Sequence, residues 1–118
     1  MSPDVAERVA RAKARLDRLD LYPAPVRIRY VRVVVWPLLF RLPWFRRFDG
    51  YSAWYTIFLR AWPRSEADDD LITHELCHVW QMQHRPVAMP LSYLRGYETN
   101  RYEAEARRAV EATRTPSA

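Results

Sequence analysis

The first twenty residues carry apolar side chains at helical spacing. After Ser2-Pro3, the apolar positions follow one another in steps of three or four residues, at Val5, Val9, Ala12, Leu16 and Leu19. That period places them on one face of an α-helix and leaves the charged residues on the other face. Serine followed by proline is a common helix start, and Pro23 prevents continuation. We therefore predict an amphipathic helix that ends before Pro23 and packs on a core.

Two later segments show patterns typical of β-strands. In Val26–Tyr30, apolar residues alternate with arginines, which predicts a strand with one solvated face. The alternation slips at Val31-Arg32, where we expect a bulge or a change of role, and Val33–Val35 can continue as strand. The turn signal Asp49-Gly50 precedes Tyr51–Trp62, which is rich in aromatic and β-branched residues. We interpret Tyr51–Trp62 as a second strand.

Residues 36–48 read WPLLFRLPWFRRF and follow neither period. Their two prolines, Pro37 and Pro43, prevent a continuous helix or a central strand. Three interpretations remain open: an interfacial patch on anionic lipid, a loop folded over the core, or a wall of a substrate cleft. Peripheral membrane contact through 36–48 is therefore one of the interactions we consider.

The second half of the chain predicts helices. The acidic run Asp68–Asp70 suits a helix N-terminus, where carboxylates accept hydrogen bonds from free amides and complement the helix dipole. From Leu71 to about His84, apolar residues spread around most of the circumference, so this helix should be largely buried. Prolines delimit a loop at 86–90. A final helical segment is expected within Leu91–Arg114, with Gly96 as a weak point.

These elements predict one domain that covers residues 1–118, because no repeat or linker interrupts them. With 118 residues, of which 49% are hydrophobic, the chain can bury a core. A charged fraction of 28% and only 2 glycines exclude a low-complexity or collagen-like chain. The predicted fold class is α+β, with an N-terminal helix, a small sheet of two to four strands and two further helices.

The charge is basic, since the formal net charge is +5 and Lys13 is the only lysine among 19 cationic residues. Such a balance favours anionic partners, or simply solvates the surface. The arginines of 27–32 and Arg46-Arg47 would serve a nucleic-acid binder, but no recognised nucleic-acid motif is present, so we expect no specific nucleic acid. The longest apolar run, Val33–Phe40, is too short to span a bilayer. The single cysteine, Cys77, excludes an internal disulfide, and we expect a cytoplasmic protein.

One motif carries metal chemistry: residues 74–78 read His-Glu-Leu-Cys-His. On a helix, His74 and His78 lie one turn apart on the same face and can bind one Zn²⁺. Glu75 lies about 100° round the axis, where it can take a proton from a zinc-bound water and pass it to the leaving amine. The alternative is a buried helix whose two histidines merely form hydrogen bonds in the core. Burying two histidines and a glutamate without a metal is costly, which favours the metal site.

A catalytic zinc needs a third protein ligand and one open position. His84 completes the metzincin spacing, but Gln81 stands where that family has a glycine that lets the chain turn. In a continuous helix, His84 points about 120° away from His78 and lies roughly 9 Å further along the axis. Glu98 and Glu103 belong to the following helical segment, and a return helix would bring either carboxylate back to the histidines. Helical periodicity does not decide between them.

The segments Thr73–Gln81 and Tyr97–Ala106 together resemble small gluzincin-type zincins, including minimal one-domain members. Several such groups share a metal-binding glutamate that opens a Glu-x-x-Ala-Asp/Asn pattern, and Glu103–Arg107 reads Glu-Ala-Glu-Ala-Arg. The resemblance therefore implies a zincin-like fold with Glu103 as the third zinc ligand. Arg107 departs from the pattern, because an aspartate or asparagine there would orient a zinc-bound histidine. Another residue must do so in this chain.

The function implied by the resemblance is a zinc-dependent metallopeptidase that hydrolyses peptide bonds with a water activated by Glu75. In such zincins, an edge strand before the motif helix pairs with an extended substrate, and Trp54–Leu59 occupies that place here. An oxyanion stabiliser is also expected, with Tyr93, Tyr97, Tyr102 and His84 as the candidates.

The alternative function is a zinc-stabilised zincin scaffold that binds a partner or a membrane without efficient proteolysis. A closed site with four protein ligands would favour the scaffold, whereas Glu75 favours the peptidase, because a structural site needs no general base. The substrate, the cleavage specificity and the oligomeric state remain open at this level.

Overall fold

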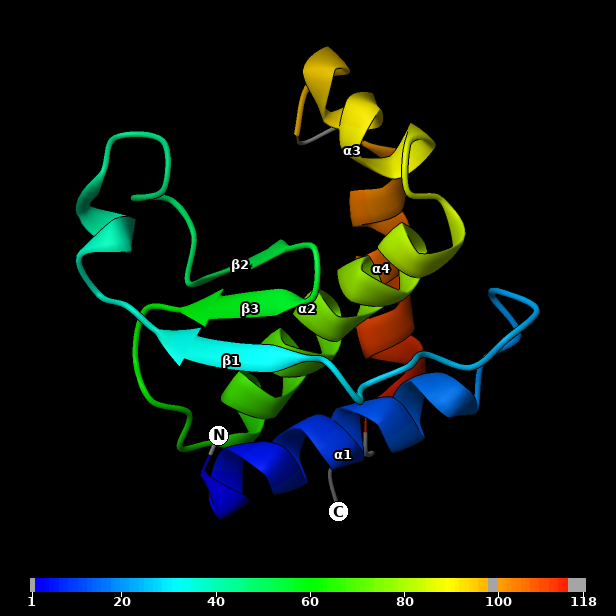
Figure 1. The fold of residues 1–118 in the computed structure, drawn as a ribbon, viewed down its shortest axis with the longest axis horizontal. Coiled ribbons are helices and arrows are strands. Elements are labelled where there is room, and N and C mark those ends of the chain that lie inside the picture. The colour runs from blue at the N-terminus through cyan, green and yellow to red at the C-terminus, as the bar shows by residue number, and fades with distance from the viewer. Residues whose placement is uncertain (1, 98–99, 115–118) are drawn as a thin grey trace.

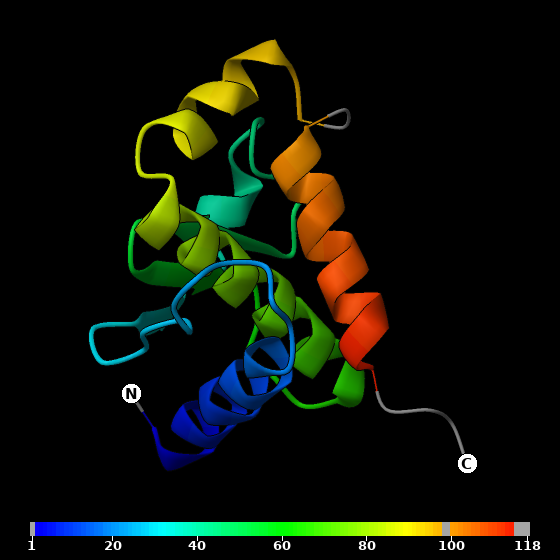
Figure 2. The same cartoon turned by 90° about the vertical axis from the view of Figure 1, so that its right-hand side faces the viewer.

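Helix α2 (Glu66–His84) is the central element, and the other elements pack around it (Figure 1, Figure 2). The structure is a computed structural model that describes residues 2–97 and 100–114. Within these ranges, the elements are α1 (Pro3–Asp17), β1 (Arg32–Val35), β2 (Gly50–Ala53), β3 (Thr56–Leu59), α2, α3 (Ala88–Ser92) and α4 (Arg101–Thr113), with short 3₁₀ helices at Leu39–Arg41 and Tyr93–Arg95. The fold is therefore α+β, as the sequence predicts.

Helix α1 confirms the predicted N-terminal helix. Ser2 caps it by accepting a hydrogen bond from the backbone N–H of Val5, and Pro3 opens its first turn. One stripe of its side chains is buried in the core that α1 shares with α2 and the sheet: Val5, Val9, Ala12 and Leu16.

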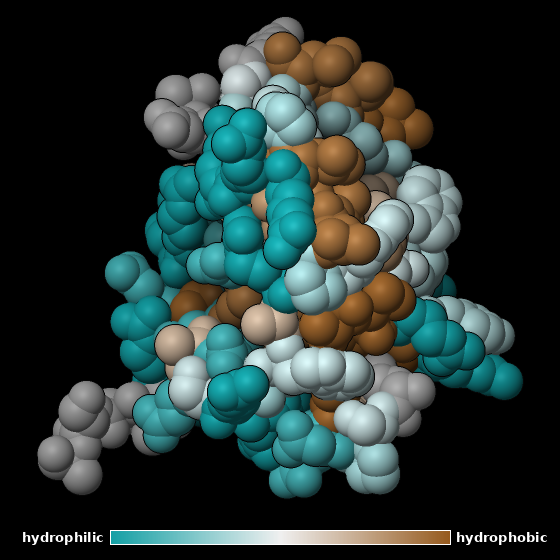
Figure 3. Space-filling view, turned by 90° about the vertical axis from the view of Figure 1, so that its left-hand side faces the viewer, coloured by the Kyte–Doolittle hydropathy of each residue, from teal (hydrophilic) through white to brown (hydrophobic). Residues whose placement is uncertain are grey.

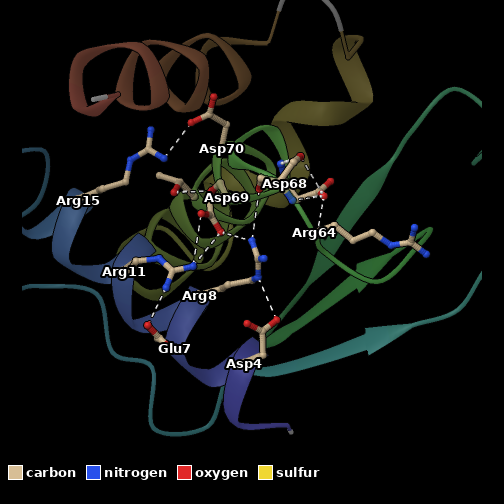
Figure 4. Close-up of polar contacts among 11 residues, drawn as sticks. Asp4, Glu7, Arg8, Arg11, Arg15, Arg64, Asp68, Asp69 and Asp70 are labelled. Atoms are coloured by element: carbon tan, nitrogen blue, oxygen red, sulfur yellow. Dashed lines mark hydrogen bonds and ion pairs between the residues drawn. The ribbon is translucent and has the colours of Figure 1, made fainter. Parts of the chain in front are cut away.

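Arginines on the other side of α1 bind carboxylates at the start of α2 (Figure 4). Arg8 Nη1 lies 2.7 Å from Oδ1 of Asp69, and Arg15 Nη1 lies 2.9 Å from Oδ1 of Asp70. Arg15 also donates to the hydroxyl of Thr113 at the end of α4. One guanidinium therefore joins three helices.

The first turn of α2 lies earlier in the chain than predicted. The helix begins at Glu66 and not at Leu71, because Ser65 and Asp68 form a capping box. The backbone N–H groups of Arg64 and Ser65 donate to Oδ2 of Asp68, at 2.7 and 3.0 Å. The acidic run is thus the first turn of the helix, and its role as an N-terminal signal is confirmed.

The three strands form a sheet in the order β1-β3-β2, in which β3 runs parallel to β1 and antiparallel to β2. The prediction of one strand over Tyr51–Trp62 was wrong, since the chain turns at Trp54-Tyr55 and forms a hairpin. Trp54 has a positive φ of 59°, a conformation that its residue type does not signal. Consequently β2 is an edge strand of the sheet. The segment Trp54–Leu59 was predicted to be the edge strand, but it contains β3, which is the central strand.

The strand predicted for Val26–Tyr30 does not form, whereas Val33–Val35 lies in β1 as expected. The side-chain amide of Gln83, near the end of α2, accepts from the N–H of Arg27 at 3.0 Å and donates to its carbonyl at 2.7 Å. This side chain satisfies the backbone that a neighbouring strand would otherwise bind.

The helical segment predicted within Leu91–Arg114 is confirmed as α4, and a separate short helix, α3, precedes it. Helix α3 begins at Ala88, inside the predicted loop at 86–90, and the chain breaks at Gly96, whose φ of 122° favours glycine. Helix α4 then runs antiparallel to α2 (Figure 1, Figure 2). This return brings the first turn of α4 against the middle of α2. No helix of the described residues is long and apolar enough to cross a membrane.

Candidate metal centre

Three side chains from two helices converge at one point. His74 and His78 come from α2, and Glu103 comes from the first turn of α4. Nε2 of His74 lies 2.6 Å from Oε1 of Glu103, Nε2 of His78 lies 2.9 Å from Oε2, and the two Nε2 atoms are 3.2 Å apart. The ligand atoms of a tetrahedral zinc ion with bonds of 2.0–2.1 Å lie about 3.3 Å apart. The two nitrogens have nearly that spacing, whereas the carboxylate is at hydrogen-bond distance and would move back by up to about 0.7 Å to admit the ion. In the described part of the chain, this is the group of donors that could hold a metal ion.

The N-cap of α4 determines where Glu103 lies. Oδ1 of Asn100 accepts from the backbone N–H groups of Tyr102 and Glu103, and Nδ2 of Asn100 donates to Oγ of Ser92 at the end of α3. The N-cap therefore fixes the backbone from which the side chain of Glu103 projects. This side chain is buried, with 1% of the residue exposed.

Two tyrosine hydroxyls complete the surroundings of Glu103. Tyr93 donates to its Oε2 at 3.1 Å, and Tyr97 donates to its Oε1 at 2.9 Å. Burial raises the pKa of Glu103, but the hydrogen bonds to the two histidines outweigh it and hold this pKa well below its usual range. Burial lowers the pKa of His78, but Glu103, Glu75 and Gln81 together raise it by more. The cluster thus contains a buried anion that favours a cation.

Gln81 orients His78. Its Nε2 donates to the carbonyl of Tyr102 at 2.8 Å, so its Oε1 faces Nδ1 of His78, also at 2.8 Å. His78 therefore donates from Nδ1 to Gln81, and Nε2 is the ring nitrogen that faces Glu103 and would bind a metal ion. From the sequence, Gln81 stands out only because it replaces the metzincin glycine, and this role was not predicted. The signal was its place three residues after His78 on the same helix face.

Glu75 is buried beside the cluster, with 5% of the residue exposed. Its Oε2 is buried and has no hydrogen-bond partner among the residues that the structure describes. Burial raises the pKa of Glu75, and the two histidines lower it to a smaller extent. An unpartnered buried carboxylate oxygen is costly, so this position fits a group that exchanges a proton with a bound water or substrate.

Two cavities meet at the cluster, and Gly50, Glu75, Tyr97 and Glu103 line both of them. The first has a volume of about 410 Å³ and is walled by β2 and by apolar side chains, namely Trp44, Trp54, Met82, Met89 and Pro90. The second has a volume of about 480 Å³ and is lined by charged side chains, among them Arg47, Arg107, Arg114 and Glu111. A bound chain would pass from an apolar to a charged environment across the cluster.

The remaining residues singled out from the sequence lie elsewhere. His84 stacks on Tyr22, with ring centroids 5.0 Å apart, and donates from Nδ1 to the carbonyl of Trp80. The hydroxyl of Tyr102 accepts from Arg101 and does not face the cluster. Of the four candidate oxyanion donors, only Tyr93 and Tyr97 contact it. Glu98 lies outside the described residues.

Comparison with known proteins found no relative. No family model matches the chain, and it matches neither a curated protein nor a solved structure. The function is therefore inferred from the geometry of the site.

Proposed function

We propose that this chain is a zinc-dependent metallopeptidase of the gluzincin type, in which His74, His78 and Glu103 bind Zn²⁺ and Glu75 is the general base. The observation that carries the proposal is the buried, unpartnered Oε2 of Glu75 beside three converging donor atoms. Two imidazoles and one carboxylate form a donor set typical of catalytic zinc. A motif helix with an antiparallel return helix that supplies the glutamate also supports a zincin-like fold.

The number of donors favours catalysis over the scaffold alternative. A structural zinc site uses four protein ligands, whereas a catalytic site uses three and leaves one position open. The described residues offer three donors, and His84, which would close the site, is stacked on Tyr22. The two cavities at the cluster give a substrate access to that open position.

Bound Zn²⁺ would supply Lewis acidity, which lowers the pKa of water and polarises a peptide carbonyl. Oε2 of Glu75 accepts the proton of the attacking water and returns it to the departing amine. Gln81 keeps His78 in the tautomer that leaves Nε2 free. The hydroxyls of Tyr93 and Tyr97, which lie beside Glu103, would stabilise the negative charge that develops on the peptide carbonyl.

Strand β2 holds the substrate. It is the edge strand of the sheet, and it walls the apolar cavity from Gly50 to Ala53. An extended peptide can pair with its outer edge and place a large apolar side chain in the cavity. This assigns to β2 the role that the sequence analysis gave to Trp54–Leu59.

The test is peptide cleavage by the zinc-loaded protein, followed by mass spectrometry on a mixture of extended peptides. We expect cleavage by the wild type and a fall of about 10²–10⁴-fold in Glu75→Gln, which keeps its zinc. Glu66→Gln, at an exposed position on the same helix, is the matched control and should cleave normally. Equal cleavage by Glu75→Gln, or none by the zinc-loaded wild type, would contradict the proposal.

A further inference from the structure

Segment 36–48 presents large apolar side chains to solvent. The exposed fractions are 47% for Trp36, 62% for Leu38, 51% for Leu42 and 56% for Trp44. Soluble proteins expose single residues of this kind, but four within nine positions form a patch that marks an interaction site.

The backbone under this patch is firmly held. Phe40, in the 3₁₀ helix Leu39–Arg41, is fully buried, and Phe48 is 7% exposed. The guanidinium of Arg60 donates to the carbonyls of Arg46 and Phe48 and lies over the ring of Phe40. Two phenylalanines therefore anchor the segment to the molecule. The exposed tryptophans and leucines lie between and beside these two anchors. They are therefore exposed although the segment itself is packed against the molecule.

The patch continues onto the sheet. Val34 of β1 pairs in register with Phe58 of β3, on the face opposite the buried Ile57 and Leu59. Val34 is 40% exposed, and the ring of Trp36 packs against Phe58, with centroids 6.1 Å apart. Viewed from the side on which 36–48 lies, apolar atoms run down the middle of the face and hydrophilic atoms gather beside them (Figure 3).

The same region concentrates positive charge. Residues 21–65 contain eight arginines and one acidic residue, Asp49, so the rest of the chain is net acidic, since the whole carries +5. Asp49 itself lies 3.3 Å from Arg60. Arg41, Arg46 and Arg47 are exposed in the segment, and in the described ranges none of them is paired with a carboxylate. Arg47 instead lies over the ring of Trp44, at 4.4 Å from its centroid.

We propose that segment 36–48, with Val34 and Phe58 beside it, docks on the surface of an anionic lipid bilayer. Tryptophan is favoured at the boundary between headgroups and acyl chains, and Leu38 and Leu42 supply aliphatic surface for the acyl side. The interleaved arginines match acidic headgroups. A nucleic acid would also match the arginines, but phosphate contacts leave the exposed leucines without a role.

Docking in this way would bring the site close to the bilayer. Trp44 belongs to the docking segment and also lines the apolar cavity beside Glu75. A polypeptide at the membrane surface would then have access to that cavity. The docking inference itself does not depend on the peptidase proposal, because it concerns a different surface and needs no metal.

Vesicle binding by the full chain tests the inference without any activity assay. We expect co-sedimentation with mixed phosphatidylglycerol–phosphatidylcholine vesicles, weakened by salt, and much weaker binding to phosphatidylcholine alone. The double variant Leu38→Ser, Leu42→Ser should lower the partition coefficient about tenfold or more. The double variant Arg41→Gln, Arg46→Gln should lower it only on anionic vesicles. Leu21→Ser and Arg108→Gln, at exposed positions outside the segment, are the controls and should bind like the wild type.

A measurement on the wild type avoids any effect of substitution on folding. Brominated lipids in the anionic vesicles should quench tryptophan emission, because four of the five tryptophans are exposed and only Trp80 is buried. Absence of both quenching and co-sedimentation would overturn the inference. Equal losses in the controls would also overturn it. Two other results would overturn the inference if vesicle binding is absent. One is a dimer in solution that the leucine variants abolish, and the other is binding to duplex nucleic acid that they abolish.

Discussion

The amide oxygen of Gln81 lies 2.8 Å from Nδ1 of His78, and both side chains are buried. The amide nitrogen of the same residue donates to the carbonyl of Tyr102, next to Glu103. One side chain therefore orients a proposed zinc ligand on α2 and holds the start of α4, which carries another. Such partners of metal ligands strongly affect metal affinity.

Replacing Gln81 by leucine should lower zinc affinity about 10–100-fold, because His78 loses the acceptor that fixes its tautomer. Competition with a chromogenic chelator measures this change. Gln83→Leu is the control, since Gln83 lies on the same helix but binds the backbone of Arg27. An unchanged affinity in Gln81→Leu, or the same loss in Gln83→Leu, would show that His78 is not positioned in this way.

Removing the hydroxyl of Tyr97 or Tyr93 should lower kcat by about 10²-fold and leave KM nearly unchanged, because the hydroxyl stabilises charge that develops only in the transition state. Tyr102→Phe is the control, since its hydroxyl binds Arg101. Steady-state kinetics on the zinc-loaded variants measures the effect. Both tyrosines also bind Glu103, so zinc content is measured alongside. A loss of zinc with normal kcat in the loaded enzyme would mean that they only position the ligand.

The capping box of α2 should make stability depend on pH in a defined direction. The N–H of Arg64, with that of Ser65, lowers the pKa of Asp68. A carboxyl whose pKa is lower in the folded state stabilises the protein above its unfolded pKa, and this contribution is lost as the pH falls through the folded pKa.

Asp68→Ala should therefore lower the free energy of unfolding by about 1 kcal/mol at neutral pH. The difference from wild type should shrink toward zero in acid. Urea unfolding across a pH series measures it, with Glu66→Ala as a first-turn control that belongs to no capping box. A difference that stays constant with pH would exclude this role for Asp68.

Gly50 lets β2 approach the helix that carries Glu75. A Cβ at this position would lie 3.1 Å from Cδ1 of Leu71 and 3.4 Å from Cγ of Glu75. Gly50→Ala should change the free energy of unfolding little, because the closest atom, Cδ1 of Leu71, is the end of a flexible side chain. Gly50→Val should cost about 1–3 kcal/mol in the free energy of unfolding and lower kcat by displacing Glu75. Ala61→Val, at an exposed position that lines neither cavity, is the control. A Gly50→Val enzyme with wild-type kcat would contradict the proposed closeness.

Local signals predicted the helices better than the sheet. The spacing of Val5 to Leu16 and the acidic run at Asp68–Asp70 act within one element, so α1 and the start signal of α2 could be recognised from the sequence. The hairpin could not, because Trp54 adopts a positive φ without the glycine that usually marks such a turn. The false strand at Val26–Tyr30 depends on Gln83, a partner 56 positions away from Arg27.

In the candidate site too, residues placed by one helix could be predicted from the sequence, and residues placed by the packing of two helices could not. His74, Glu75 and His78 stand together because helix geometry alone places them, and spacing reveals this. Helical periodicity does not distinguish Glu103 from Glu98 as the third candidate ligand, so Glu103 could be predicted only from the resemblance to gluzincins. Gln81, and the choice of Tyr93 and Tyr97 among the candidate donors, depend on how α4 returns along α2, which no local pattern encodes.

Metal content after zinc reconstitution, measured by elemental mass spectrometry, is the sharpest test of the proposed zinc site. We expect about one zinc per chain in the wild type, as for a single catalytic site, and its loss in Glu103→Ala. Zinc should remain in His84→Ala, Glu98→Ala and Glu111→Ala, the last of which is an exposed glutamate on α4. A wild type that binds no zinc, or a Glu103→Ala variant that keeps it, would contradict the proposed site.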